Sequence, residues 1–143
     1  PWSAGFLKKM RRERPALQMI PKSNVSTRAI VQALREKRHI GLLIDQKYNP
    51  GIPVPFMGRP AMTSTAFAQL AQKMDVPLIP TRLERLKGAH FRLTFMEPVP
   101  TYDQNGALRS VEDIIRDTHL FLENWIRERP EQWLWLHRRW PES

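Results

Sequence analysis

The sequence predicts an α/β fold in which helices and strands are layered around a mainly parallel sheet. Residues 40–44, Ile-Gly-Leu-Leu-Ile, form a continuous apolar run, as expected for a strand buried on both faces. Residues 110–129 repeat apolar side chains at helical spacing behind a capping serine, Ser110. Strand-like and helix-like segments alternate along the chain, and this alternation favours parallel strands joined by helices.

Local signals place the individual elements. Asn24 or Ser26 can cap a helix, the Pro- and Gly-rich stretch 46–62 predicts a loop, and the alternation over 90–96 predicts a strand with one apolar side. The expected order is strand 16–20, helix 26–38, strand 40–44, loop to 62, helix 64–74, strands 76–83 and 90–96, helix 110–129 and a further element from Pro130. No repeat or linker divides the chain, so we expect residues 1–143 to belong to one domain.

The composition points to an anionic partner. The 143 residues carry a net charge of +9, contain no cysteine and give a pI near 10.6. This charge is compatible with nucleic acid, anionic lipid or a phosphorylated substrate, and it does not choose among them. The missing cysteines exclude disulfides and thiolate metal sites. No apolar run approaches the roughly 18–20 residues of a membrane span.

Polar side chains that follow the 40–44 run are the first candidates for a site. Asp45 and Gln46 come at the carboxyl end of that expected strand, where open α/β sheets bind ligands. Arg59 precedes an expected helix N-terminus. Its guanidinium and the free amides at the helix start both favour binding of an anion. The alternative is an aspartate that only caps a turn and an arginine that is only exposed.

The histidines offer no clear general base. Six extended residues separate His39 from Asp45 by about 20 Å, too far for a dyad. His119 and Glu123 are one helical turn apart but off the apolar stripe, so a solvated face is expected for them. His90 opens a strand without a carboxylate partner.

The two ends of the chain combine aromatic and basic residues. Residues 1–14 are compatible with a helix on an anionic membrane surface or with a solvated helix. Residues 130–140, Pro-Glu-Gln-Trp-Leu-Trp-Leu-His-Arg-Arg-Trp, are compatible with stacking on single-stranded nucleic acid. We favour a short amphipathic helix that packs these tryptophans on the core. His137 and Glu142 have the spacing His-x4-acid, but Pro141 lies between them, and we interpret this spacing as coincidence.

Several motifs, taken in order, resemble one family. They are Gly-Leu-Leu-Ile-Asp-Gln at 41–46, Val-Pro-Phe-Met-Gly-Arg-Pro-Ala at 54–61, Val-Pro-Leu-Ile-Pro at 76–80, Pro-Glu-Gln-Trp-Leu-Trp at 130–135 and His-Arg-Arg-Trp at 137–140. Together they resemble the bacterial lipid A biosynthesis acyltransferases (lauroyl/myristoyl type), within the wider glycerolipid acyltransferase group.

The resemblance implies transfer of a fatty acyl chain from acyl carrier protein or acyl-CoA to a hydroxyl of a lipid A precursor or a related glycolipid, during lipopolysaccharide biosynthesis in a Gram-negative bacterium. It implies an αβα sandwich at the cytoplasmic face of the inner membrane, with no cofactor and no metal. Asp45 falls where the family has a supporting acidic residue. Gln46, Arg59 and Arg85 are expected to bind substrate, the arginines through its phosphates. No nucleic-acid partner is expected.

One part of the family pattern is missing. The His-x4-Asp/Glu motif that activates the acceptor hydroxyl lies upstream of the motifs found here, usually behind an apolar anchor. We therefore expect the chain to be the C-terminal part of the acyltransferase domain, incomplete at its N-terminus and inactive alone. The alternatives are a non-catalytic module that binds lipid or carrier protein, a basic nucleic-acid-binding domain, or an acyltransferase with a glycerophospholipid acceptor.

Overall fold

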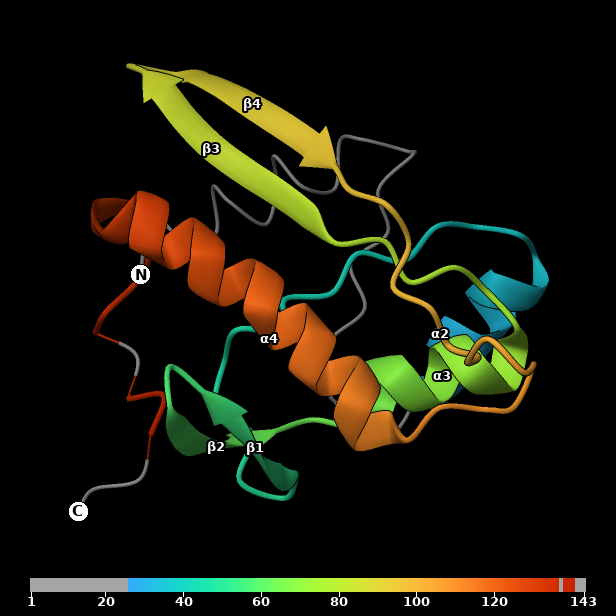
Figure 1. Cartoon of the computed structure of the whole chain (residues 1–143). Helices are drawn as coiled ribbons and strands as arrows, with labels where there is room; N and C mark the ends of the chain where they lie inside the picture. Colours follow the sequence, from blue (N-terminus) through green and yellow to red (C-terminus); the bar gives the residue numbers. More distant parts are fainter. Residues whose placement is uncertain (1–25, 137, 141–143) are drawn as a thin grey trace. The chain divides into compact units, whose positions relative to one another are not determined.

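The computed structural model describes residues 26–136 and 138–140 (Figure 1). The chain divides into two compact units, Pro1–Gly41 and Leu42–Ser143. The expected strand 16–20 and the opening segment 1–14 lie outside the described residues. His137, Pro141 and Glu142 lie outside them too.

The described part of the first unit consists of one helix and the residues that follow it. Helix α2 spans Ser26–Arg35, which confirms the expected helix, although it ends earlier than residue 38. Lys37 adopts a left-handed backbone conformation with φ of 58°. Its amide bonds to the carbonyl of Leu34 at 2.9 Å, and the Arg38 amide bonds to that of Ala33 at 2.9 Å. These two bonds cap the last carbonyls of the helix.

The run 40–44 is not a strand, which corrects the first expectation. The described residues provide no strand that pairs with it. Without a partner, its backbone gains no ladder hydrogen bonds and its side chains are not covered on both sides. Leu43 is accordingly 83% exposed, although the sequence pattern had predicted burial.

The expected loop 46–62 contains a β-hairpin. Strand β1, Ile52–Phe56, pairs antiparallel with β2, Arg59–Thr63. Met57 and Gly58 form the turn with φ of 52° and 75°, the left-handed pair that suits a two-residue hairpin. The prolines predicted a loop, yet three of them lie in the strands. The pairs Pro53↔Met62 and Pro55↔Pro60 are non-hydrogen-bonded pairs, which alternate with the pairs that exchange hydrogen bonds. At these positions a missing N–H costs the ladder nothing.

The second hairpin joins β3, Thr81–Lys87, to β4, His90–Phe95. Strand β4 is where the sequence predicted it, whereas β3 begins at residue 81 and not at residue 76. Both sheets among the described residues are two-stranded and antiparallel, so the expected mainly parallel sheet and αβα sandwich are not observed there. Alternating apolar patterns do not specify strand direction, and connections of two residues can join only antiparallel strands.

Helix α4, Val111–Glu128, lies between the two hairpins (Figure 1). Its start is as predicted, because Ser110 accepts a hydrogen bond from the Asp113 amide at 3.0 Å. Helix α3, Ala66–Met74, packs on α4, and the short 3-10 helix η1, Pro130–Gln132, follows α4. Two buried clusters form the core. The larger contains Val54, Phe67, Ala68, Val99, Ile114 and Ile115, and the smaller contains Phe56, Ala61 and Ile126.

Gly51 lets the backbone before β1 pass close to the backbone of Thr63 in β2. A Cβ at this position would overlap the backbone carbonyl of Thr63, whereas nothing lies within 4 Å of a Cβ at Gly41. We predict that Gly51→Ala lowers the free energy of unfolding by more than about 1 kcal/mol, because the backbone must shift. Gly41→Ala is the matched control and should change it by less than about 0.5 kcal/mol. Chemical denaturation measures both, and equal effects would contradict the close approach.

Candidate functional site

The chain after η1 folds back over the first hairpin. The indole N–H of Trp140 donates to the Phe56 carbonyl at 3.1 Å. The Phe56 ring packs against two indoles, with centroids 5.9 Å from Trp133 and 5.6 Å from Trp140, and the two indoles lie 6.1 Å apart. Trp133 and Trp140 therefore pack on the core, as expected, whereas Trp135 is 54% exposed. The expected helix does not continue past Gln132, so the packing is made by residues without regular secondary structure.

Arg139 anchors this segment inside the protein. Its side chain is 1% exposed and donates to the Met62 carbonyl at 2.8 Å and to the Thr63 hydroxyl at 2.7 Å. The guanidinium also lies over the Phe56 ring, 5.2 Å from its centroid. Its Nε atom has no hydrogen-bond partner among the described residues. Burial lowers the pKa of Arg139, and the negative charge of Asp45 opposes that shift.

Asp45 therefore belongs to the environment of the C-terminal segment. Its carboxylate accepts a hydrogen bond from the Trp133 indole at 3.3 Å and acts electrostatically on Arg139. The carboxylate is half-buried. The sequence had placed Asp45 at the end of a strand, and it lies instead at a bend whose position is fixed by residues almost ninety positions away.

His119 and Glu123 are buried, which corrects the expectation of a solvated face. His119 is 1% exposed and Glu123 8% exposed. The His119 Nδ1 lies 2.8 Å from the Pro55 carbonyl oxygen, which can only accept, so Nδ1 carries the proton. Its Nε2 then presents a lone pair to the Arg139 guanidinium, 3.4 Å away. Thr63 cannot donate to that lone pair, because its hydroxyl donates to the Ala61 carbonyl.

Glu123 holds the turn of the first hairpin. Its carboxylate accepts the Met57 amide at 2.8 Å and the Arg127 guanidinium at 2.7 Å. The sequence predicted only one buried face for α4. The helix has a second, because residues 115, 119, 122 and 126 form another stripe at helical spacing, facing β1. This spacing could have predicted the second buried face from the sequence, but the polar His119 within the stripe made it look solvated.

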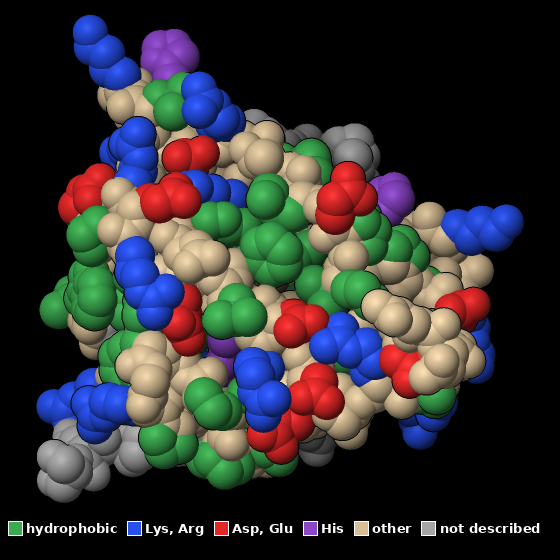
Figure 2. Space-filling model, viewed as in Figure 1, with side chains coloured by type: hydrophobic (Ala, Val, Ile, Leu, Met, Phe, Trp, Pro, Cys, Tyr) green, Lys and Arg blue, Asp and Glu red, His purple; other side chains and the backbone are tan. Residues whose placement is uncertain are grey.

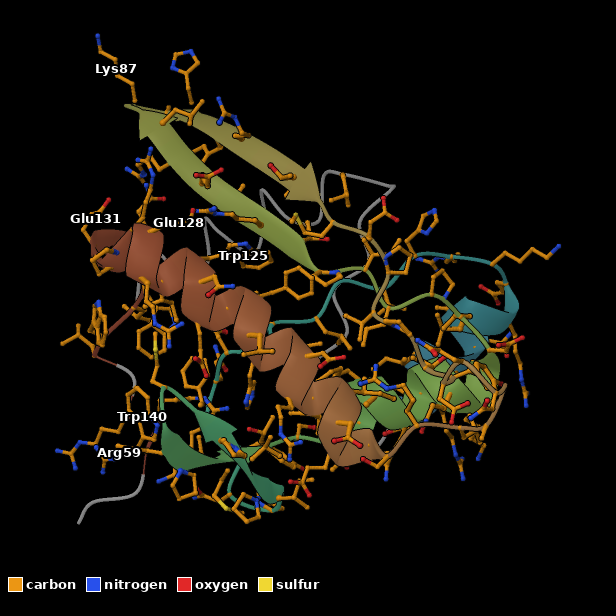
Figure 3. The ribbon with its side chains drawn as sticks, viewed as in Figure 1. Arg59, Lys87, Trp125, Glu128, Glu131 and Trp140 are labelled. Atoms are coloured by element: carbon orange, nitrogen blue, oxygen red, sulfur yellow. The ribbon has the colours of Figure 1, made fainter. Side chains whose placement is uncertain are left out.

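The other predicted site residues lie at two places. Arg59 is exposed beside Trp140, with its guanidinium 5.8 Å from the ring centroid (Figure 3). Arg85 is exposed on β3, where its backbone amide and carbonyl bond to the Gln132 side chain at 2.9 and 3.0 Å. Gln46 is exposed next to Asp45. Asp45 and Arg59 thus share the C-terminal aromatic cluster, and Arg85 belongs to the second hairpin.

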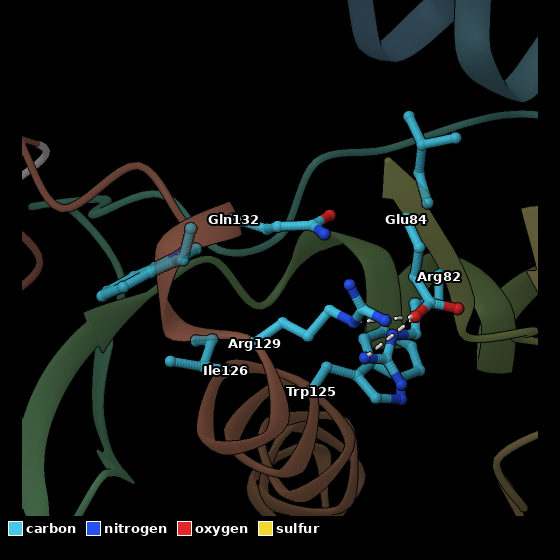
Figure 4. A pocket seen from close by; sticks show the side chains of 8 residues that line it. Arg82, Glu84, Trp125, Ile126, Arg129 and Gln132 are labelled. Atoms are coloured by element: carbon cyan, nitrogen blue, oxygen red, sulfur yellow. Dashed lines mark ion pairs between the residues drawn. The ribbon is translucent and has the colours of Figure 1, made fainter. Parts of the chain in front are cut away.

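A small cavity of about 90 Å³ opens between β3 and the end of α4 (Figure 4). It is lined by Arg82, Glu84, Trp125, Ile126, Arg129 and Gln132, among others. The charges of its wall are paired, since Glu84 meets Arg82 at 3.4 Å and Arg129 at 3.7 Å. The volume accommodates a few water molecules and not a fatty acyl chain.

Within residues 26–136 and 138–140, no three His, Asp or Glu side chains gather as metal ligands would. In the same part of the chain, no helix has both the length and the apolar character needed to cross a bilayer.

These features define a mixed α/β protein in which a carboxylate lies beneath a basic, tryptophan-rich C-terminal segment. The model of one family, described as bacterial lipid A biosynthesis acyltransferase, matches residues 7–142. The chain belongs to that family, as its motifs suggested. No curated protein matches the sequence.

His119 makes the stability of the fold depend on pH. Burial lowers its pKa below the ordinary 6.5, Arg139 adds to the lowering, and the Pro55 carbonyl and Glu123 oppose it. The unfolded chain therefore binds a proton at a higher pH than the folded chain does. We predict that the free energy of unfolding falls as the pH drops below about 6.5, until the folded His119 is itself protonated.

Denaturant titrations between pH 8 and pH 5 measure this effect, with the pH range set around the ordinary histidine value. His119→Asn keeps an amide N–H near the Pro55 carbonyl and should flatten the dependence over that range. Leu120→Asn, at an exposed position of the same helix, controls for a substitution in α4. If His119→Asn and the wild type run parallel, His119 does not carry the pH dependence.

Proposed function

We propose that the chain is part of an enzyme that transfers a fatty acyl chain from acyl carrier protein or acyl-CoA to a hydroxyl of a lipid A precursor. The observation that carries the proposal is the family match over residues 7–142. That stretch includes Asp45, the first hairpin and the buried Arg139. Lipopolysaccharide biosynthesis in a Gram-negative bacterium is the process to which this reaction belongs.

We assign Asp45 a positioning role. Its bond to Trp133 and the effect of its charge on Arg139 support this role, since both partners belong to the segment that covers the first hairpin. Arg139 is too deeply buried to touch a substrate. Gln46, Arg59 and Arg85 are exposed and are the groups proposed to bind substrate, the two arginines through its phosphates.

The reaction itself needs a base. The acceptor hydroxyl oxygen bonds to the thioester carbonyl carbon, the carbon–sulfur bond breaks, and the hydroxyl proton passes through a base to the departing thiolate. Of the three described histidines, His119 is buried with Nδ1 bonded to Pro55, and His90 is bonded to the Lys87 carbonyl at 3.1 Å. The third, His39, is exposed in the first unit. We therefore propose that the base comes from a His-x4-acid motif upstream of these residues and that the 143-residue chain is inactive alone.

The proposed location is the cytoplasmic face of the inner membrane. The net charge of +9 supports this, because an anionic lipid precursor, an anionic membrane surface and an acidic carrier protein would all be attracted to it. No cofactor or nucleic acid is part of the proposal.

Asp45→Asn tests the site in an enzyme preparation that contains this chain and transfers acyl groups. The amide keeps the size of the side chain but removes the charge that acts on Arg139 and weakens acceptance from Trp133. We predict a loss of acyl transfer of about a hundredfold, because a displaced positioning group misaligns the reactants. Radiolabelled or mass-spectrometric detection of the acylated lipid measures it.

Glu97→Gln is the matched control, since Glu97 is an exposed carboxylate with none of the contacts of Asp45. It should retain wild-type turnover. Normal turnover of Asp45→Asn, with thermal stability equal to that of the control, would show that Asp45 has no part in the reaction.

A further inference from the structure

The β3–β4 hairpin turns its polar side inward. Arg82 and Glu84 point toward the end of α4. Arg82 pairs with Glu128, and Glu84 pairs with Arg129, the latter pair drawn in Figure 4. The Arg82 guanidinium also lies over the Trp125 ring, 5.9 Å from its centroid. In a sheet with one solvated side, the apolar side normally packs on the core. This hairpin has the reverse polarity.

The outer face of the hairpin is apolar and open to solvent. The register places Leu83 opposite Leu93, Thr81 opposite Phe95 and Arg85 opposite Phe91, so all six side chains share one face. Its four large apolar side chains, Leu83, Phe91, Leu93 and Phe95, are between 50% and 68% exposed. Four neighbouring exposed side chains of this size mark an interaction surface.

The charge on this outer face has one sign. Arg85 lies over the Phe91 ring at 5.1 Å, and the face carries no carboxylate. Lys87 extends from the outer end of the hairpin (Figure 3), where Lys and Arg side chains gather in the space-filling view (Figure 2). The partner is therefore expected to be apolar and anionic at once.

We propose that the outer face of the β3–β4 hairpin contacts the surface of an anionic lipid bilayer. Leucine and phenylalanine side chains enter the boundary between headgroups and acyl chains, while Arg85 and Lys87 reach lipid phosphates. A second copy of the chain fits less well, because stacking two such faces would bury both Arg85 guanidinium groups without carboxylates. The hairpin thereby gives the proposed membrane location a specific point of contact, and the inference rests on that location.

A fluorescent label on the hairpin tests the proposal. The sequence has no cysteine, so Leu93→Cys accepts a single nitrobenzoxadiazole label, and Leu108→Cys, in an exposed loop, is the matched control. On mixing the chain with phosphatidylglycerol vesicles, the label at residue 93 should brighten and shift to the blue. The label at residue 108 should stay in water, and phosphatidylcholine vesicles should give a weaker response at residue 93.

Substitutions on the same face provide the second measurement. Leu83→Ser combined with Phe95→Ser should lower binding in vesicle sedimentation by about tenfold, since both side chains leave water only on the bilayer. Leu108→Ser should leave binding unchanged. Arg85→Gln should lower binding to phosphatidylglycerol vesicles by about fivefold, with little effect at high salt. Circular dichroism checks that each variant is folded.

Three results of the vesicle experiments would overturn the proposed contact. If the chain binds phosphatidylglycerol vesicles while the label at residue 93 stays in water, the hairpin is not the contact, although the membrane location stands. If the chain does not bind these vesicles, the hairpin contact fails, whereas the proposed acyl transfer, which rests on the family match, is not overturned. A label at residue 93 that is already shielded without lipid would mean that a second copy or another segment covers the face, and this too would overturn the proposal.

Discussion

The buried guanidinium of Arg139 is the interaction on which the described site depends. It bonds to Met62 and Thr63 in the first hairpin, lies over Phe56 and faces the lone pair of His119 on α4. One side chain from the C-terminal segment thus connects a hairpin and a helix that are distant in sequence. Burying a cation is costly, and here the described residues offset the cost with two short hydrogen bonds, an aromatic face and the nearby charge of Asp45.

The same arrangement explains why Asp45 lies where it does. Its segment forms no strand, so regular backbone pairing does not position it. Trp133 bonds to its carboxylate, and Trp133 is in turn held against Phe56 and Trp140. The family motifs around Asp45, in the first hairpin and at the C-terminal end therefore meet in one place.

The sequence predicted what local chemistry determines. The capping Ser110, the apolar stripe of α4 and the alternation of β4 all became the expected elements. It could not predict strand direction, because antiparallel pairing is decided by turns such as Met57-Gly58 and not by apolar periodicity. Nor could it predict the burial of His119, because a polar residue looks solvated until a partner such as Arg139 is placed beside it. Asp45 could be named as a candidate from the sequence, but its contacts with Trp133 and Arg139 are tertiary and no local pattern specifies them.

The most direct measurement is a double-mutant cycle between Asp45 and Arg139, read as the free energy of unfolding. Asp45→Asn, Arg139→Met and the double variant remove the two charges singly and together. Coupled charges predict that the effects are non-additive by about 1 kcal/mol or more, since Asp45→Asn leaves the Arg139 cation buried without its compensating charge. Additivity within about 0.5 kcal/mol would contradict the account, because Asp45 and the buried guanidinium would then be independent.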